Sequence, residues 1–69
     1  MDKVTLKRYI KFIRNFGVEI DGKFIYVHDG HNSLILNPDT PWKEFLGHSV
    51  FEVAEAVAKE LKLQIKQIE

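Results

Sequence analysis

The chain has 69 residues and a mass of 8.1 kDa, with 45% hydrophobic residues, 12% aromatic residues and no cysteine. This size allows one domain, residues 1–69, and the composition excludes intrinsic disorder, a disulfide scaffold, a cysteine-ligated zinc site and a thiol nucleophile. Ten basic and ten acidic residues give a formal net charge of zero, which argues against a strongly basic nucleic-acid binder. The chain has no apolar run of about 18 residues and no charged-then-apolar leader, so we expect a cytoplasmic protein without membrane contact.

Residues 3–15 are predicted to form a helix, with Asp2 as its N-cap and Gly17 just past its end. At 100° per residue one stripe of this helix is apolar and a neighbouring stripe is basic. The apolar stripe is Leu6, Tyr9, Ile10 and Ile13, with Phe16 at its edge, and the basic stripe is Lys3, Lys7, Lys11 and Arg14. Five basic residues and one acidic residue occur in 1–16, against five and nine in 17–69. The basic stripe is either a solvated face or a contact surface for an anionic partner.

Two Asp-Gly pairs follow, at 21–22 and 29–30, and both favour two-residue type I′ hairpin turns. They predict a three-stranded antiparallel β-meander over residues 18–20, 23–28 and 31–36. The turns would set Ile20 opposite Lys23 and His28 opposite His31.

Because side chains alternate along a strand, the predicted meander has two different faces. One face is apolar and would join the core: Val18, Ile20, Ile25, Val27, Leu34 and Leu36. The other is mixed: Glu19, Phe24, Tyr26, His28, His31, Ser33 and Ile35.

Two more helices are expected after the meander. Thr40 and Pro41 are typical of a helix start, and Gly47 would close a short helix around Trp42, Phe45 and Leu46. Ser49 and Glu52 match a capping box for a long helix. Its buried stripe would be Val50, Val53, Ala54, Val57 and Leu61. Residues 62–68 alternate as in a strand but also fit a continued helix, and the strand is slightly favoured.

The fold class is therefore α+β: a small two-layer domain with its helices on one face of the sheet. The second sheet face would carry Phe24, Tyr26 and Ile35. Three interpretations stay open: a stacking platform for unpaired bases, a surface for a protein partner or a second copy, or burial under the long helix or the Trp42 segment. Trp42 itself fits a lid on the core or an interface anchor.

The stretch from His28 to His31 would place two imidazoles opposite each other, with Asp29 close by and His48 as a further candidate metal ligand. A polar turn is the more common use of such a pair, and we predict neither a metal nor a cofactor. The same imidazoles fit general acid and base in phosphodiester cleavage.

The order helix, three strands, helix over residues 6–62 resembles the double-stranded-RNA-binding-like fold of the HicA toxins, small ribonucleases paired with an antitoxin. That family has a catalytic histidine after a Gly-Ser pair at the start of its strands. Here the corresponding residues 21–24 are Asp-Gly-Lys-Phe, without a histidine. The resemblance therefore assigns no family, and a HicA-like ribonuclease stays an alternative through His28 and His31.

The sequence favours a non-enzymatic interaction module that binds a protein partner or itself. The predicted partner-binding residues are Phe24, Tyr26, His28, His31, Ile35 and Trp42. The alternative, nucleic-acid binding, would use Lys3, Lys7, Lys11 and Arg14 for phosphates.

Overall fold

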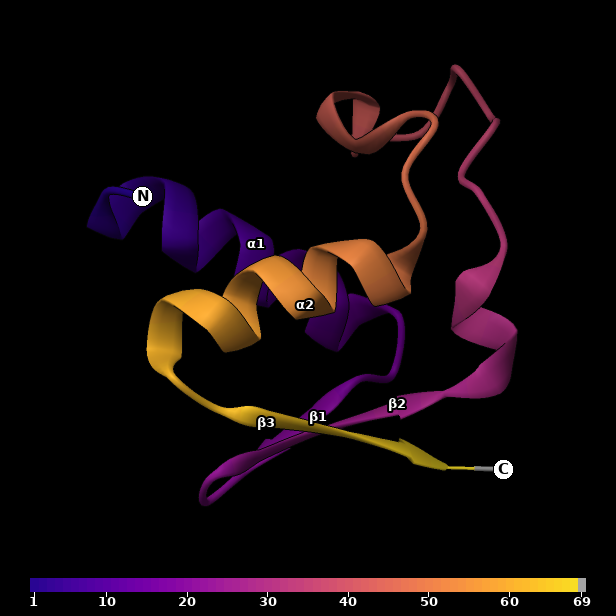
Figure 1. The fold of residues 1–69 in the computed structure, drawn as a ribbon. Helices are drawn as coiled ribbons and strands as arrows, with labels where there is room; N and C mark the ends of the chain where they lie inside the picture. Colours follow the sequence, from indigo (N-terminus) through magenta and orange to yellow (C-terminus); the bar gives the residue numbers. More distant parts are fainter. Residues whose placement is uncertain (69) are drawn as a thin grey trace.

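A computed structural model describes residues 1–68 and shows a small α+β domain in two layers (Figure 1). In chain order its elements are α1 (Lys3–Asn15), β1 (Glu19–Asp21), β2 (Phe24–His28), η1 (Asp29–Asn32), η2 (Lys43–Phe45), α2 (Val50–Leu61) and β3 (Gln64–Ile68), where η marks a 3₁₀ helix. The sheet has the order β1-β2-β3, with β1 antiparallel and β3 parallel to β2. Both helices lie on the same side of this mixed sheet (Figure 1). The α+β class is thus confirmed, whereas the all-antiparallel meander is wrong.

The first helix has the predicted bounds and caps. The Asp2 carboxylate accepts a hydrogen bond from the backbone N–H of Thr5 at 2.7 Å, which keeps the pKa of Asp2 below its ordinary value. At the other end Gly17 has a φ of +85° and donates its N–H to the carbonyl of Arg14. A left-handed residue of this kind is what ends many helices.

The first hairpin forms, but its turn lies one residue further along than predicted. Asp21 pairs with Phe24 and Ile20 with Ile25, so the two turn residues are Gly22 and Lys23. Gly22 has a φ of +59°, as the first central position of a type II′ turn requires. The predicted opposition of Ile20 and Lys23 is therefore wrong. The faces are still correct, because each residue's partner has moved by two positions and side chains repeat with period two.

The second predicted hairpin does not form, and residues 31–36 are not a strand of the sheet. The chain turns through η1 instead, where the Asn32 amide donates to the Asp29 carbonyl at 3.1 Å and the His28 N–H donates to His31 Nδ1 at 3.1 Å. Such local hydrogen bonds between side chains and backbone compete with the backbone hydrogen bonds of a β-sheet. Leu34 and Leu36, predicted as core residues, are 52% and 74% exposed.

The free edge of β2 is occupied by the C-terminal strand. β3 pairs with β2 along five positions, from Phe24 with Gln64 to His28 with Ile68. The strand predicted over 62–68 is thus confirmed for residues 64–68, and α2 ends at its C-cap Lys62, which takes a left-handed φ of 58°. A lysine in that conformation explains why no glycine or proline marks this helix end.

The segment before α2 follows the predicted capping in part. Ser49 Oγ accepts the N–H of Glu52 at 3.0 Å, as expected. The Glu52 carboxylate contacts His48 Nδ1 at 3.1 Å, which makes a different use of that side chain from the predicted capping box. The short helix around Trp42 is a single 3₁₀ turn, and Leu61 is 37% exposed and not part of the buried stripe.

The core lies between the sheet and the two helices. The hydrophobic residues buried there are Phe12, Ile13, Val18, Ile25, Val27, Phe45, Val50, Val53, Ala54, Val57 and Ala58. They come from both helices, from the sheet and from the connecting segments, so α1 and α2 cover the inner face of the sheet.

Candidate protein-interaction surface

The side of the sheet that faces away from the helices, called the outer face below, is formed by alternate residues of all three strands. It consists of Glu19 and Asp21 from β1, Phe24, Tyr26 and His28 from β2, and Gln64, Lys66 and Ile68 from β3. The strand register aligns these residues in rows across the sheet. One row is Glu19, Tyr26 and Lys66, and the next is Asp21, Phe24 and Gln64.

An aromatic pair occupies the centre of the outer face. The rings of Phe24 and Tyr26 are 6.1 Å apart between centroids, at an angle of 45°, and both side chains are half-buried. The Lys66 ammonium lies 4.4 Å from the Phe24 ring centroid, within the range of a cation–π contact. The pair is therefore shielded by its neighbours in the sheet, while both helices pack against the opposite side (Figure 1).

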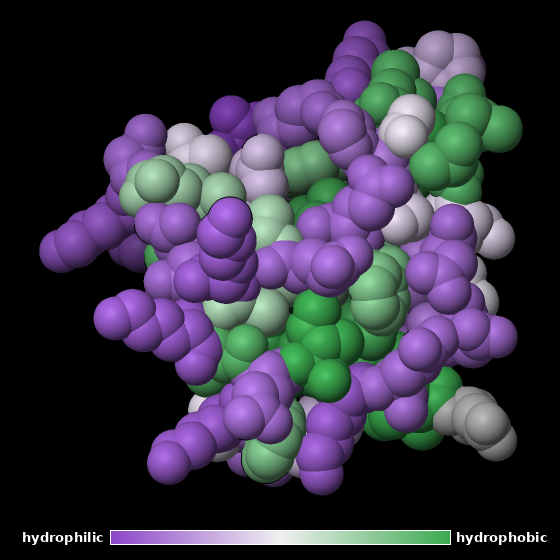
Figure 2. All heavy atoms as spheres, in the orientation of Figure 1, coloured by the Kyte–Doolittle hydropathy of each residue, from purple (hydrophilic) through white to green (hydrophobic). Residues whose placement is uncertain are grey.

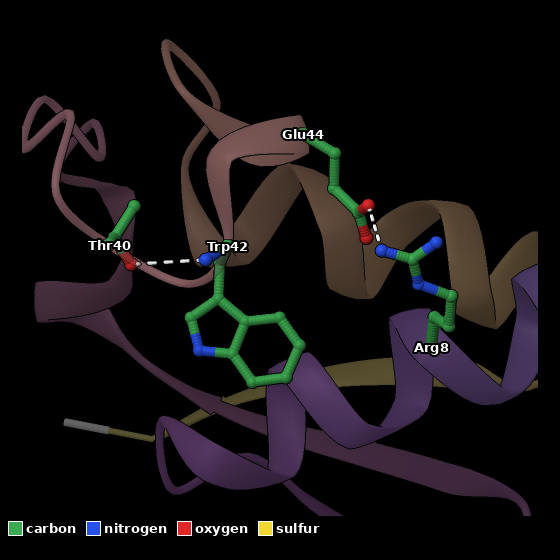
Figure 3. Close-up of polar contacts among 4 residues, drawn as sticks. All are labelled: Arg8, Thr40, Trp42 and Glu44. Atoms are coloured by element: carbon green, nitrogen blue, oxygen red, sulfur yellow. Dashed lines mark hydrogen bonds and ion pairs between the residues drawn. The ribbon is translucent and has the colours of Figure 1, made fainter.

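Trp42 lies in the helix layer, not at the outer face. Its indole makes an edge contact with the ring of Phe12, with 5.5 Å between the ring centroids. The backbone N–H of Trp42 donates to Thr40 Oγ1 at 3.3 Å (Figure 3). Nearby, Arg8 of α1 forms an ion pair with Glu44, which ties the η2 turn to the helix (Figure 3). Of the two interpretations for Trp42, its position fits the lid on the core.

Ile35 also lies away from Phe24 and Tyr26, so its predicted place on the same sheet face is wrong. It sits in the loop before α2, where its N–H donates to the His48 carbonyl at 3.1 Å and its carbonyl accepts from Gly47 at 2.8 Å. The Ile35 side chain is half-buried and packs against the core.

The same loop exposes an apolar cluster that the sequence did not predict. Phe16, Leu34 and Leu36 line a shallow hollow together with His31 and Val50. Hydrophobic side chains gather over the segment between β2 and α2, at the upper right of Figure 2. Two of these residues alternate as in a buried strand, so only the failure of the second hairpin reveals them as surface.

The histidine pair is close, although no hairpin holds it. The rings of His28 and His31 are 5.5 Å apart between centroids, and His31 Nδ1 already accepts the N–H of His28. Asp29 accepts hydrogen bonds from Asn32 and from Gln67, the latter at 2.7 Å. Within residues 1–68 no group of three or more histidine, cysteine, aspartate or glutamate side chains is placed to hold a metal.

The basic stripe lies on the exposed side of α1. Lys7, Lys11 and Arg14 flank the half-buried Ile10 in a shallow surface hollow. Because α1 packs against the inner face of the sheet, this stripe and the aromatic pair belong to different layers of the molecule.

No family model, no curated protein and no solved structure matches this chain. Across residues 1–68 the two helices are too short and too polar to cross a bilayer.

Proposed function

We propose that this chain is a non-enzymatic interaction module that binds a protein through the outer face of its sheet. The observation that carries the proposal is the pair Phe24 and Tyr26 at the centre of a sheet face against which neither helix packs. Aromatic side chains contribute large contact areas at protein interfaces, and charged residues beside them provide specificity.

The charges of the outer face favour a protein over a nucleic acid. Two carboxylates, Glu19 and Asp21, flank the aromatic pair on one side, and a single cation, Lys66, flanks it on the other. A nucleic acid stacked on Phe24 and Tyr26 would bring its phosphates close to those carboxylates, which would repel them.

Site-specific photocrosslinking tests this proposal. A photoreactive phenylalanine analogue replaces Tyr26 in the expressed protein, and a matched protein carries it at Lys59, an exposed position of α2 in the other layer. We expect irradiation to give a defined adduct from position 26 that protease removes and nuclease does not, and no such adduct from position 59. A nuclease-sensitive adduct at 26, or equal labelling at both positions, would contradict the proposal.

A second candidate function, nucleic-acid binding, is favoured by the basic stripe, which places Lys3, Lys7, Lys11 and Arg14 along one exposed side of α1. Under this hypothesis the stripe contacts phosphates, so the double variant K7E/K11E should weaken oligonucleotide binding and reduce its dependence on salt. Wild-type affinity and salt dependence in that variant would rule it out.

A further inference from the structure

We infer that the partner of the outer face is a second copy of this chain, related to the first by a twofold axis parallel to the strands. The inference rests on the function proposed above and specifies its partner. It starts from the order of charges across the sheet, which is acidic on β1, aromatic on β2 and basic on β3.

A twofold axis along the strands, midway between two stacked sheets, places β1 of one copy over β3 of the other and β2 over β2. Positions along the strands are unchanged by this rotation, so each row meets the same row of the second copy. Glu19 therefore faces Lys66 of the second copy, and the reverse contact forms at the same time. An interface with this symmetry repeats every contact twice.

The other in-plane twofold axis, perpendicular to the strands, gives the opposite result. It would stack β1 on β1 and β3 on β3, so that the carboxylates of Glu19 and Asp21 would lie over the acidic strand of the second copy and Lys66 would have no carboxylate opposite it. Like charges placed face to face disfavour association. The charge order of the three strands thus selects one of the two arrangements.

Distances between packed sheets are compatible with these ion pairs. Sheets stack about 10 Å apart, a gap that an extended lysine and a glutamate reaching toward each other can bridge. The Lys66 ammonium already leans over Phe24 and so toward the row of Asp21, which puts it within reach of either carboxylate of the opposing β1. Tyr26 and Phe24 would fill the centre of the interface, where aromatic residues contribute most.

The size of the face predicts a weak dimer. Three strands spaced about 4.8 Å apart give a narrow patch, below the roughly 800 Å² per partner of a standard stable interface. We therefore expect a reversible monomer–dimer equilibrium that depends on protein concentration.

Charge reversal combined with mixing tests both the partner and the axis. In Glu19→Lys alone, lysine would face Lys66 of the second copy, and in Lys66→Glu alone, glutamate would face Glu19. Each variant should dimerise at least about tenfold more weakly than the wild type in sedimentation equilibrium at protein concentrations up to about 1 mM. In an equimolar mixture of the two variants, both contacts pair opposite charges, so a heterodimer should form.

The matched controls are Glu55→Lys and Lys59→Glu, which make the same charge changes at exposed positions of α2. We expect the wild-type dimer constant in both. A wild type that stays monomeric over the whole range, or a mixture that associates no better than its components, would overturn the inference.

The failure of this inference can be distinguished from the failure of the proposed function. If position 26 crosslinks to a different protein while the wild type stays monomeric, the outer face binds a partner that is not a second copy. If position 26 gives no protein adduct, the proposed function itself fails.

Discussion

The two Asp-Gly pairs of this chain have the same sequence and different structures. Asp21 and Gly22 lie at the turn of an antiparallel hairpin, in which Gly22 has a positive φ. Asp29 and Gly30 begin a 3₁₀ helix, and Gly30 is not among the glycines with a positive φ. The difference shows that a dipeptide favours a turn, while the presence of a free strand edge decides whether a hairpin follows.

Competition for one edge of β2 explains why no hairpin forms at Asp29 and Gly30. After β1 has paired with β2, a single edge remains, and β3 occupies it along five positions. α2 packs on the core and delivers β3 to that edge after only Lys62 and Leu63. The segment after Gly30, which begins with the three polar residues His31, Asn32 and Ser33, is left as a loop held by local hydrogen bonds.

The largest difference between the regions after the two Asp-Gly pairs is expected in how much their apolar residues contribute to the free energy of unfolding. Ile25, in the strand after the first Asp-Gly, is fully buried, and Ile25→Ala should lower the free energy of unfolding by about 2–5 kcal/mol. Leu36, after the second Asp-Gly, is 74% exposed, and Leu36→Ala should change it by no more than about 0.5 kcal/mol. Urea denaturation of both variants measures this contrast, and equal losses would mean that residues 31–36 pack in the core after all.

A smaller contrast is expected between the glycines themselves. Gly22→Ala forces a side chain into the left-handed region and should cost about 1–2 kcal/mol, although nothing lies within 4 Å of the added Cβ. Gly30→Ala meets neither a positive φ nor a neighbouring atom and should be neutral or slightly stabilising, because it restricts the unfolded chain. Thermal unfolding of the two variants gives the comparison. A destabilised Gly30→Ala would indicate a strained conformation at the second site.

The smallest effect is expected from the side chain that fastens η1. Asp29→Ala removes the acceptor for Gln67 of β3 and for Asn32, and because all three are exposed it should cost less than about 1 kcal/mol. Faster hydrogen exchange at the amides of η1, with unchanged exchange in β1, would show that this carboxylate holds the second turn. Equal acceleration in η1 and in β1 would instead indicate global destabilisation.

The candidate site was predictable where it depends on alternation within one strand. Phe24 and Tyr26 are two residues apart, so they share a face whatever the register, and the buried Ile25 and Val27 fix which face that is. Ile35 was misplaced because its position depended on a strand that does not form. Lys66 was missed because its place beside the aromatic pair depends on a parallel strand far along the chain.

The apolar cluster of Phe16, Leu34 and Leu36 was not predicted for the same reason: the prediction assumed a strand that does not form. Alternating apolar residues predict burial only if a neighbouring strand pairs with them. Here the neighbouring strand would be β2, whose remaining edge already pairs with β3. The sequence shows which residues are apolar, but its local pattern does not show which segment pairs with the second edge of β2.

The sequence by itself determined the α+β class, both ends of α1, the start of α2, and the two faces of β1 and β2. These features depend on caps, glycines and periodicities that act within a few residues. Tertiary structure decided the mixed sheet, the 3₁₀ turn at the second Asp-Gly, and the charge order across the outer face. Each of these depends on the pairing of β2 with β3, a contact between segments about 40 residues apart in the sequence that only the packing of α2 on the core brings together.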